Sequence, residues 1–174
     1  LLFDDVMWAR KAREEHQAFA KGLEEKGVKV HLFRDKLGEA LEIPEAREFL
    51  MERVANEDTV GPQLVEPLRE LAESVSGADL ASFMIGGVLK KDLNLPKNVS
   101  LLWAYLDDYD FVLTPLPNHL FQRDNTAFAY DGLSVNPMAK PVWSLKNTRY
   151  WFLVLSTHDA VSSPRFRVIS GWIM

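Results

Sequence analysis

The feature that most constrains the fold is a run of short helical patterns over residues 34–95, placed between two stretches that contain strand patterns. Apolar residues recur there at helical spacing, and no segment alternates apolar and polar side chains convincingly, as a half-buried strand would. Pro44 and Pro62 suit the first turn of a helix, and Asp79 suits an N-cap. We therefore expect helices at Asp35–Leu41, Pro44–Ala55, Pro62–Val75 and Asp79–Ile85. Whether Val88–Leu93 forms one more helix stays open.

One apolar stripe within this segment indicates how the helices pack. Residues that share one helix face recur there at intervals of four, three and four positions: Leu64, Leu68, Leu71 and Val75. Such a stripe is usually the core of a small bundle and less often a partner-binding surface. The pair Gly86-Gly87 is expected to end a helix, because it lacks the preceding strand and the following Lys-Ser/Thr of a phosphate loop.

The segment before the bundle has the pattern of one α/β unit. Asp4 and Asp5 can cap a helix that runs to about Lys26, where Gly27 ends it. The alternating residues Val28–Leu32 then predict a strand. The apolar face of the predicted helix consists of Trp8, Ala12, Phe19 and Leu23.

The segment after the bundle has mostly strand patterns. Tyr109–Thr114 predicts one strand, and Ala127–Val135 predicts a hairpin with Asp131-Gly132 as its type I′ turn. Arg165–Ile169 alternates as a strand, and Asn147–Thr157 predicts a helix. The chain is thus expected to be an α/β domain, in the broad α+β class, with an inserted α-helical bundle.

Composition excludes several classes of function. The formal charge of −5 argues against nucleic acid as the main partner, since phosphate binding needs a basic surface, and no stretch is apolar enough to predict a membrane span. The lack of cysteine excludes disulfides, zinc–thiolate sites and a cysteine nucleophile within these residues, and it fits a cytoplasmic protein. No metal site is expected, because no two of the histidines have ligand spacing: His16, His31, His119 and His158. Both ends are expected to continue into a longer chain, since the first residue is Leu1 and the last residues are apolar.

The candidate binding site is a proline-punctuated loop, Pro117–Asp124, between predicted strands. The carboxylate of Asp124 can accept two parallel N–H bonds from a guanidinium or amidinium group. Asn118 can hold a carboxylate or amide of the same substrate, and Phe121 can stack on a flat cation. A structural interpretation stays open, in which Arg123-Asp124 is an ion pair, Phe121 a core residue and Asn118 a turn residue.

Two other kinds of catalytic site find no support in the sequence. There is no G-x-S-x-G pattern of a serine nucleophile. The carboxylate pairs Asp4-Asp5 and Asp107-Asp108 are adjacent in sequence, so their side chains diverge on a strand or a helix and do not suit a glycosidase.

Four motifs stand along the chain: Leu1-Leu2-Phe3-Asp4-Asp5-Val6, Pro115-Leu116-Pro117-Asn118, Phe121-Gln122-Arg123-Asp124 and Asn136-Pro137-Met138-Ala139-Lys140-Pro141. Together, in their order and in their separation, they resemble the arginine deiminase family. The pattern Pro-Asn-x-x-Phe-x-Arg-Asp is fairly specific to that family, whereas the other motifs would be weak alone. The helical segment 34–95 also falls where that family inserts a helical bundle.

The resemblance implies a fold and a reaction. The fold is a pentein-type propeller of ββαβ modules, to which the chain would supply a partial module (1–33), the inserted bundle (34–97) and a second partial module (98–174). The reaction is the hydrolysis of L-arginine to L-citrulline and ammonia, in which a cysteine attacks the guanidinium carbon and a histidine moves protons. This chemistry needs no metal and no organic cofactor.

The resemblance also assigns site residues. Asp124 matches the carboxylate that grips the guanidinium, and Asn118 and Phe121 match residues of the substrate pocket. Leu2 lies in a segment that resembles a loop closing near that pocket. L-Arginine is then the partner, and a homo-oligomer of the full-length protein stays open.

Two departures from the family pattern leave alternatives. The nucleophilic cysteine of the family lies beyond the position of Met174, so this chain alone is expected to be inactive. Trp143 stands where the family usually has an arginine that contacts the substrate carboxylate. A catalytically dead or diverged interaction protein therefore stays open, as does another guanidine-modifying enzyme, although the bundle and the Asn136–Pro141 motif disfavour the latter.

Overall fold

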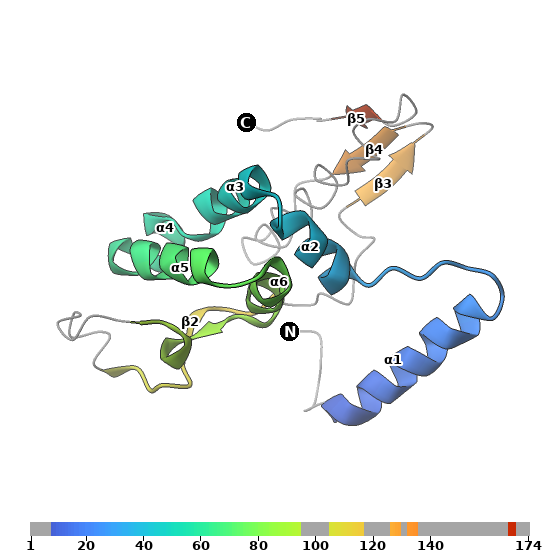
Figure 1. Ribbon diagram of the computed structural model, residues 1–174, viewed down its shortest axis with the longest axis horizontal. Coiled ribbons are helices and arrows are strands. Elements are labelled where there is room, and N and C mark those ends of the chain that lie inside the picture. The colour runs from blue at the N-terminus through green and yellow to red at the C-terminus, as the bar shows by residue number, and fades with distance from the viewer. Residues whose placement is uncertain (1–7, 95–104, 117–125, 130–131, 136–166, 170–174) are drawn as a thin grey trace. The chain divides into compact units, whose positions relative to one another are not determined.

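The computed structural model describes residues 8–94, 105–116, 126–129, 132–135 and 167–169. The chain divides into two compact units, Leu1–Phe33 and Arg34–Met174. The described residues are mostly helical, with one two-stranded and one three-stranded sheet (Figure 1). The prediction of the α+β class is therefore confirmed.

The first unit contains one amphipathic helix, α1 (Ala9–Glu24). The N-cap is Trp8, so the prediction that Asp4 and Asp5 cap this helix is wrong, since an N-cap directly precedes the first helical residue. The predicted end is confirmed at Gly27, which has φ 79° and donates its N–H to Glu24 O at 2.9 Å. None of the residues of α1 is buried.

The predicted strand Val28–Leu32 is wrong, because the structure places these residues in neither a helix nor a strand. Its alternating residues fit one face of a sheet, but a strand forms only where a neighbour satisfies its backbone hydrogen bonds. Among the described strands, none pairs with this segment.

The second unit begins with a series of helices, as the patterns of residues 34–95 predict. Prolines start two of them, at N1, and both of these predicted starts are confirmed. One short helix was not predicted, and its N-cap Asn56 accepts from Thr59 N at 3.0 Å. The helices are α2 (Phe33–Leu41), α3 (Pro44–Val54), α4 (Glu57–Val60), α5 (Pro62–Ser74) and α6 (Gly77–Gly86).

The start of α6 differs from the prediction by a few residues. Ser76 is the N-cap, and its hydroxyl oxygen accepts from Asp79 N at 3.1 Å. The same hydroxyl donates to Asp79 Oδ2 at 2.8 Å. Asp79 is therefore the third residue of the helix rather than its cap.

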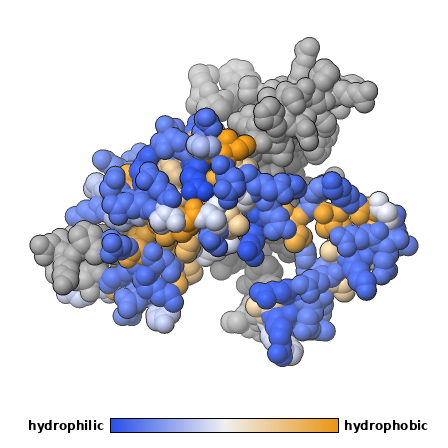
Figure 2. All heavy atoms as spheres, in the orientation of Figure 1, coloured by the Kyte–Doolittle hydropathy of each residue, from blue (hydrophilic) through white to orange (hydrophobic). Residues whose placement is uncertain are grey.

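The core of this unit lies between the helices. From α5, Leu64, Leu68 and Ala72 are buried, so the predicted stripe is a core stripe, although Leu71 and Val75 are only half-buried. Figure 2 shows hydrophilic side chains over most of the outward face of the helical region in that view. The largest fully buried side chains are Leu37, Leu41, Leu50, Val54, Leu64, Leu68, Leu80, Met84 and Val88.

A small antiparallel sheet follows α6. It pairs β1 (Val88–Leu89) with β2 (Phe111–Leu113), and the 3-10 helix η1 (Lys90–Asp92) follows β1. The prediction of a strand within Tyr109–Thr114 is confirmed, as is the end of α6 at the glycine pair. The helix left open at Val88–Leu93 is present only as the 3-10 turn Lys90–Asp92. Val88 instead pairs with Leu113, a partner too distant in sequence for local periodicity to reveal.

A second sheet has the order β3-β4-β5. The antiparallel hairpin is confirmed in β3 (Thr126–Ala129) and β4 (Gly132–Val135). Ala129 pairs with Gly132, so Gly132 belongs to the strand and the prediction that it forms the turn is wrong. The strand β5 (Arg167–Ile169) pairs in parallel with β4, which confirms the final strand. The helix predicted at Asn147–Thr157 lies outside the described residues.

Candidate functional site

The residues predicted to bind substrate lie outside the part of the chain that the structure describes. This applies to Asp124, Asn118 and Phe121 of the loop, to Leu2, and to Trp143. Their roles stay predictions. The structure does describe the segment that leads into the loop, up to Leu116.

The segment that leads into the loop is fixed at two points. In β2, Leu113 is 2% exposed and pairs with Val88 of β1. Three residues later, Leu116 is 8% exposed, and its N–H donates to Ile85 O at the end of α6 at 3.0 Å. The chain therefore enters residues 117–124 from a position that α6 and the β1–β2 sheet hold by backbone contacts.

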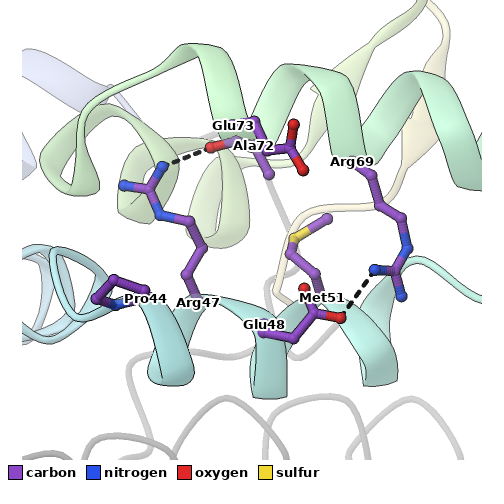
Figure 3. Close-up of a pocket in the computed structure, with 7 residues that line it drawn as sticks. All are labelled: Pro44, Arg47, Glu48, Met51, Arg69, Ala72 and Glu73. Atoms are coloured by element: carbon purple, nitrogen blue, oxygen red, sulfur yellow. Dashed lines mark hydrogen bonds and ion pairs between the residues drawn. The ribbon is translucent and has the colours of Figure 1, made fainter.

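The described residues also form a groove of about 210 Å³ between α3 and α5. Figure 3 shows two guanidinium groups, from Arg47 and Arg69, on opposite sides of Met51. The remaining residues that line the groove are Pro44, Glu48, Ala72 and Glu73.

Arg47 uses its guanidinium to join three parts of the bundle. Its Nε donates to Leu41 O at 3.0 Å, at the end of α2. Its Nη1 donates to Ala72 O at 2.7 Å and to Val75 O at 3.0 Å, at the end of α5. These carbonyls lie at the C-terminal ends of their helices, where carbonyl groups have no hydrogen-bond partner within the helix. Arg47 therefore acts as a structural clamp, and sequence reasoning missed it because no pattern marks an arginine that caps a distant helix.

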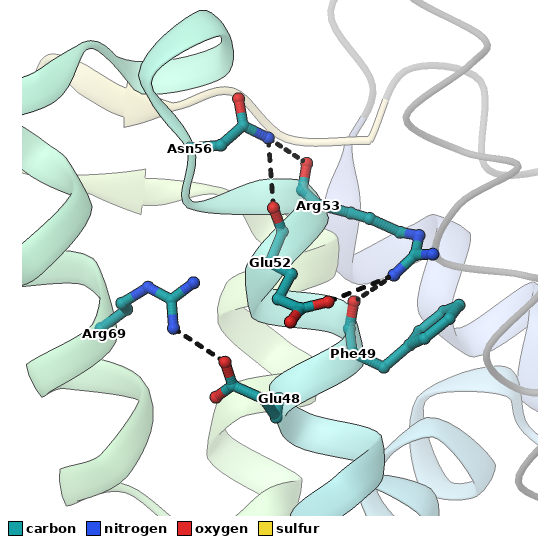
Figure 4. A network of polar contacts seen from close by, with 6 residues as sticks. All are labelled: Glu48, Phe49, Glu52, Arg53, Asn56 and Arg69. Atoms are coloured by element: carbon teal, nitrogen blue, oxygen red, sulfur yellow. Dashed lines mark hydrogen bonds and ion pairs between the residues drawn. The ribbon is translucent and has the colours of Figure 1, made fainter.

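The polar contacts beside the groove are also structural. Arg69 Nη1 lies 3.0 Å from Glu48 Oε1 and joins α5 to α3 (Figure 4). Arg53 lies over the ring of Phe49, 3.5 Å from its centroid, and donates to Phe49 O at 3.0 Å. Asn56 Nδ2 donates to Arg53 O at 2.9 Å, which ends α3 as the next helix begins. These groups stabilise helix ends and helix contacts, so the groove has the features of bundle packing rather than of a catalytic centre.

Acidic residues gather beside β2, at Asp107, Asp108 and Asp110. Asp110 Oδ2 accepts from Asp107 N at 2.8 Å, so this carboxylate is used to form a turn. Nearby, Lys91 Nζ lies 4.1 Å from the ring centroid of Tyr109. Within the described residues there is no group of three His, Cys, Asp or Glu side chains that could hold a metal ion. The described helices include none that is long and apolar enough to cross a membrane.

A comparison with known protein families agrees with the motifs. Residues 1–158 of the 174 match the family model described as ADI, arginine deiminase. The matched range includes helices α1 to α6, the β1–β2 sheet, the β3–β4 hairpin and the loop Pro117–Asp124. The resemblance seen in the motifs is thereby confirmed, and the chain belongs to the arginine deiminase family.

Proposed function

We propose that the chain is the N-terminal portion of an arginine deiminase, which hydrolyses L-arginine to L-citrulline and ammonia. The family match over residues 1–158 carries this proposal. The pattern Pro-Asn-x-x-Phe-x-Arg-Asp at residues 117–124, inside the matched range, supports it.

In this proposal Asp124 holds the guanidinium of the substrate. A carboxylate suits this role, because it accepts two parallel N–H bonds from the planar cation and so fixes its orientation. A charge is needed rather than an amide, since a cation in a dry site must recover the free energy of its lost hydration. Asn118 and Phe121 line the same pocket, and Leu2 belongs to a segment that closes near it.

The remaining chemistry is assigned to residues beyond this chain. The sequence contains no cysteine, so the nucleophile that attacks the guanidinium carbon must come from elsewhere in the protein. Residues 1–33 and 98–174 would be parts of two propeller modules, with the bundle of residues 34–97 inserted between them. The described contacts support a scaffold role for the bundle, because they fix the strand that enters the loop.

The test is an assay of citrulline formation with two proteins. The protein encoded by the complete gene should convert L-arginine to citrulline, with no added metal or cofactor. The chain of 174 residues, purified alone, should release none, because it lacks the nucleophile. Citrulline formation by the short chain would contradict the assignment of the nucleophile, and no citrulline from the complete protein would contradict the proposed activity.

A second candidate is a diverged family member that no longer catalyses the reaction. Trp143 favours it, because the family pattern has an arginine at that position to contact the substrate carboxylate. Trp143→Arg in the complete protein separates the two candidates. A catalyst would already be active with Trp143 present, whereas a diverged member would be inactive and would gain arginine binding only on substitution.

A further inference from the structure

We propose that the turn between α6 and β1 sets the position of the arginine-binding loop, with Gly87 as its positioning residue. This inference rests on the proposed function and deepens it, since it assigns a role in substrate binding to a residue outside the loop. Three features carry it: the backbone at Gly87, its contacts with β2, and the hydrogen bond of Leu116.

Gly87 has a backbone conformation that other residues rarely adopt. Its φ is 86° and its ψ 168°, a region that is essentially restricted to glycine. Its N–H donates to Phe83 O at 2.8 Å and so ends α6. Figure 1 shows the chain leaving the end of α6 and continuing into the small sheet that contains β2.

Gly87 also leaves no room for a side chain on the side that faces β2. A Cβ atom at this position would lie 2.7 Å from Leu113 O and 2.9 Å from Cδ1 and Cε1 of Phe111. Ordinary van der Waals contact begins near 3.4 Å, so β2 would have to withdraw by several tenths of an ångström. The atom closest to the added carbon belongs to the backbone, so a change of side-chain rotamer cannot relieve the contact.

The same turn holds the chain where it enters the loop. Ile85, two residues before Gly87, accepts the N–H of Leu116 at 3.0 Å. Val88, directly after Gly87, pairs with Leu113. The turn thus contacts β2 and its exit on both sides of Gly87, and Leu116 directly precedes the loop that contains Asp124. A displacement of β2 is therefore transmitted along the backbone to the loop.

The test compares two glycine substitutions in the full-length enzyme. Gly87→Ala introduces both backbone strain and the contact with β2. Gly61→Ala is the matched control, because Gly61 has φ 81° and ψ 155° but no atom lies within 4 Å of the place that a Cβ would take. Both variants should lose thermal stability, since both force alanine into a glycine conformation. Only Gly87→Ala should lower kcat/KM for L-arginine, by about tenfold or more and mainly through KM, because misplacing a binding group by about 1 Å costs about 100-fold.

A second measurement reports the coupling without activity. Amide hydrogen exchange at Leu116 should become faster in Gly87→Ala than in Gly61→Ala, because the bond to Ile85 O is lost or lengthened. If Gly87→Ala does not fold, Leu116→Pro replaces it, since proline removes this N–H donor together with the leucine side chain, at a position already flanked by Pro115 and Pro117. Leu116→Ala is its control, because alanine keeps the donor and loses the side chain.

The outcomes separate this inference from the proposed function. Equal KM values and equal Leu116 exchange in Gly87→Ala and Gly61→Ala would overturn the positioning role, as would equal KM values in Leu116→Pro and Leu116→Ala. Failure of the unsubstituted full-length protein to form citrulline would overturn the proposed function instead. The exchange measurement would then still decide whether Gly87 positions the backbone at Leu116.

Discussion

Removing the guanidinium of Arg47 should cost the bundle more stability than removing that of Arg69 from the same groove. The hydrogen bonds of Arg47 reach Leu41 O, Ala72 O and Val75 O at 3.0, 2.7 and 3.0 Å. A hydrogen bond to a charged group contributes about 1.5–3 kcal/mol, but such values are not additive. Val75 is half-buried, so water can replace part of its bond. We therefore expect Arg47→Met, which keeps the length and removes the donors, to lower the free energy of unfolding by about 3 kcal/mol.

The assay is urea denaturation of the full-length protein, in which a spectroscopic probe placed in the bundle monitors unfolding. The matched control is Arg69→Met. The Arg69 side chain is 30% exposed and its partner Glu48 61% exposed, so this ion pair should contribute at most about 1 kcal/mol. Arg47→Lys should fall between the two, because an ammonium group is a point charge and cannot span the three carbonyls as a planar guanidinium does.

Equal losses of stability in Arg47→Met and Arg69→Met would refute this reasoning. They would mean that the hydrogen bonds of Arg47 to distant helix ends stabilise the bundle no more than one exposed ion pair does. The midpoints can be compared only if the denaturant slope is unchanged. A changed slope would indicate altered compactness of one state rather than a lost contact.

Three further predictions concern the site and the bundle. Asp124→Asn in the full-length protein should lower kcat/KM for L-arginine by orders of magnitude, because an amide cannot provide the charged bidentate grip, and near wild-type activity would remove this role from Asp124. Ser76→Ala should destabilise the protein by about 1 kcal/mol through loss of the α6 cap, measured by thermal unfolding, whereas no loss would mean that Asp79 alone suffices. Leu64→Ala should lower the free energy of unfolding in urea by about 2–5 kcal/mol, because Leu64 is 1% exposed. Phe19→Ala should change it by less than about 0.5 kcal/mol, because Phe19 is 68% exposed, and comparable losses in the two variants would contradict the assignment of the core.

The helices of the bundle could be predicted because their signals are local. Pro44 and Pro62 mark first turns, and the spacing of Leu64 and Leu68 marks a buried face. A four-residue helix such as α4 is too short for periodicity to show, so it was missed.

The errors occurred where distant partners decide the structure. Val28–Leu32 has the alternation of a strand but no described partner, whereas Val88 has no strand pattern of its own and pairs with Leu113. The clamp of Arg47 joins residues that lie 25 and 28 positions away, which no local pattern encodes. The candidate site depended on family motifs rather than on periodicity, and Asp124, Asn118, Phe121 and Leu2 lie outside the described residues.

The exposed helix α1 has a consequence for how the chain opens. None of its residues is buried, so within its own unit the helix depends on helix propensity and on exposed pairs such as Lys11–Glu15 at 4.0 Å. Isolated helices shorter than about 12–15 residues are only marginally stable in water, and α1, with 16 residues, is barely longer. In this chain, the amide hydrogens of α1 should therefore exchange with solvent through local fraying. Those of α3 and α5 should exchange only when the bundle opens cooperatively.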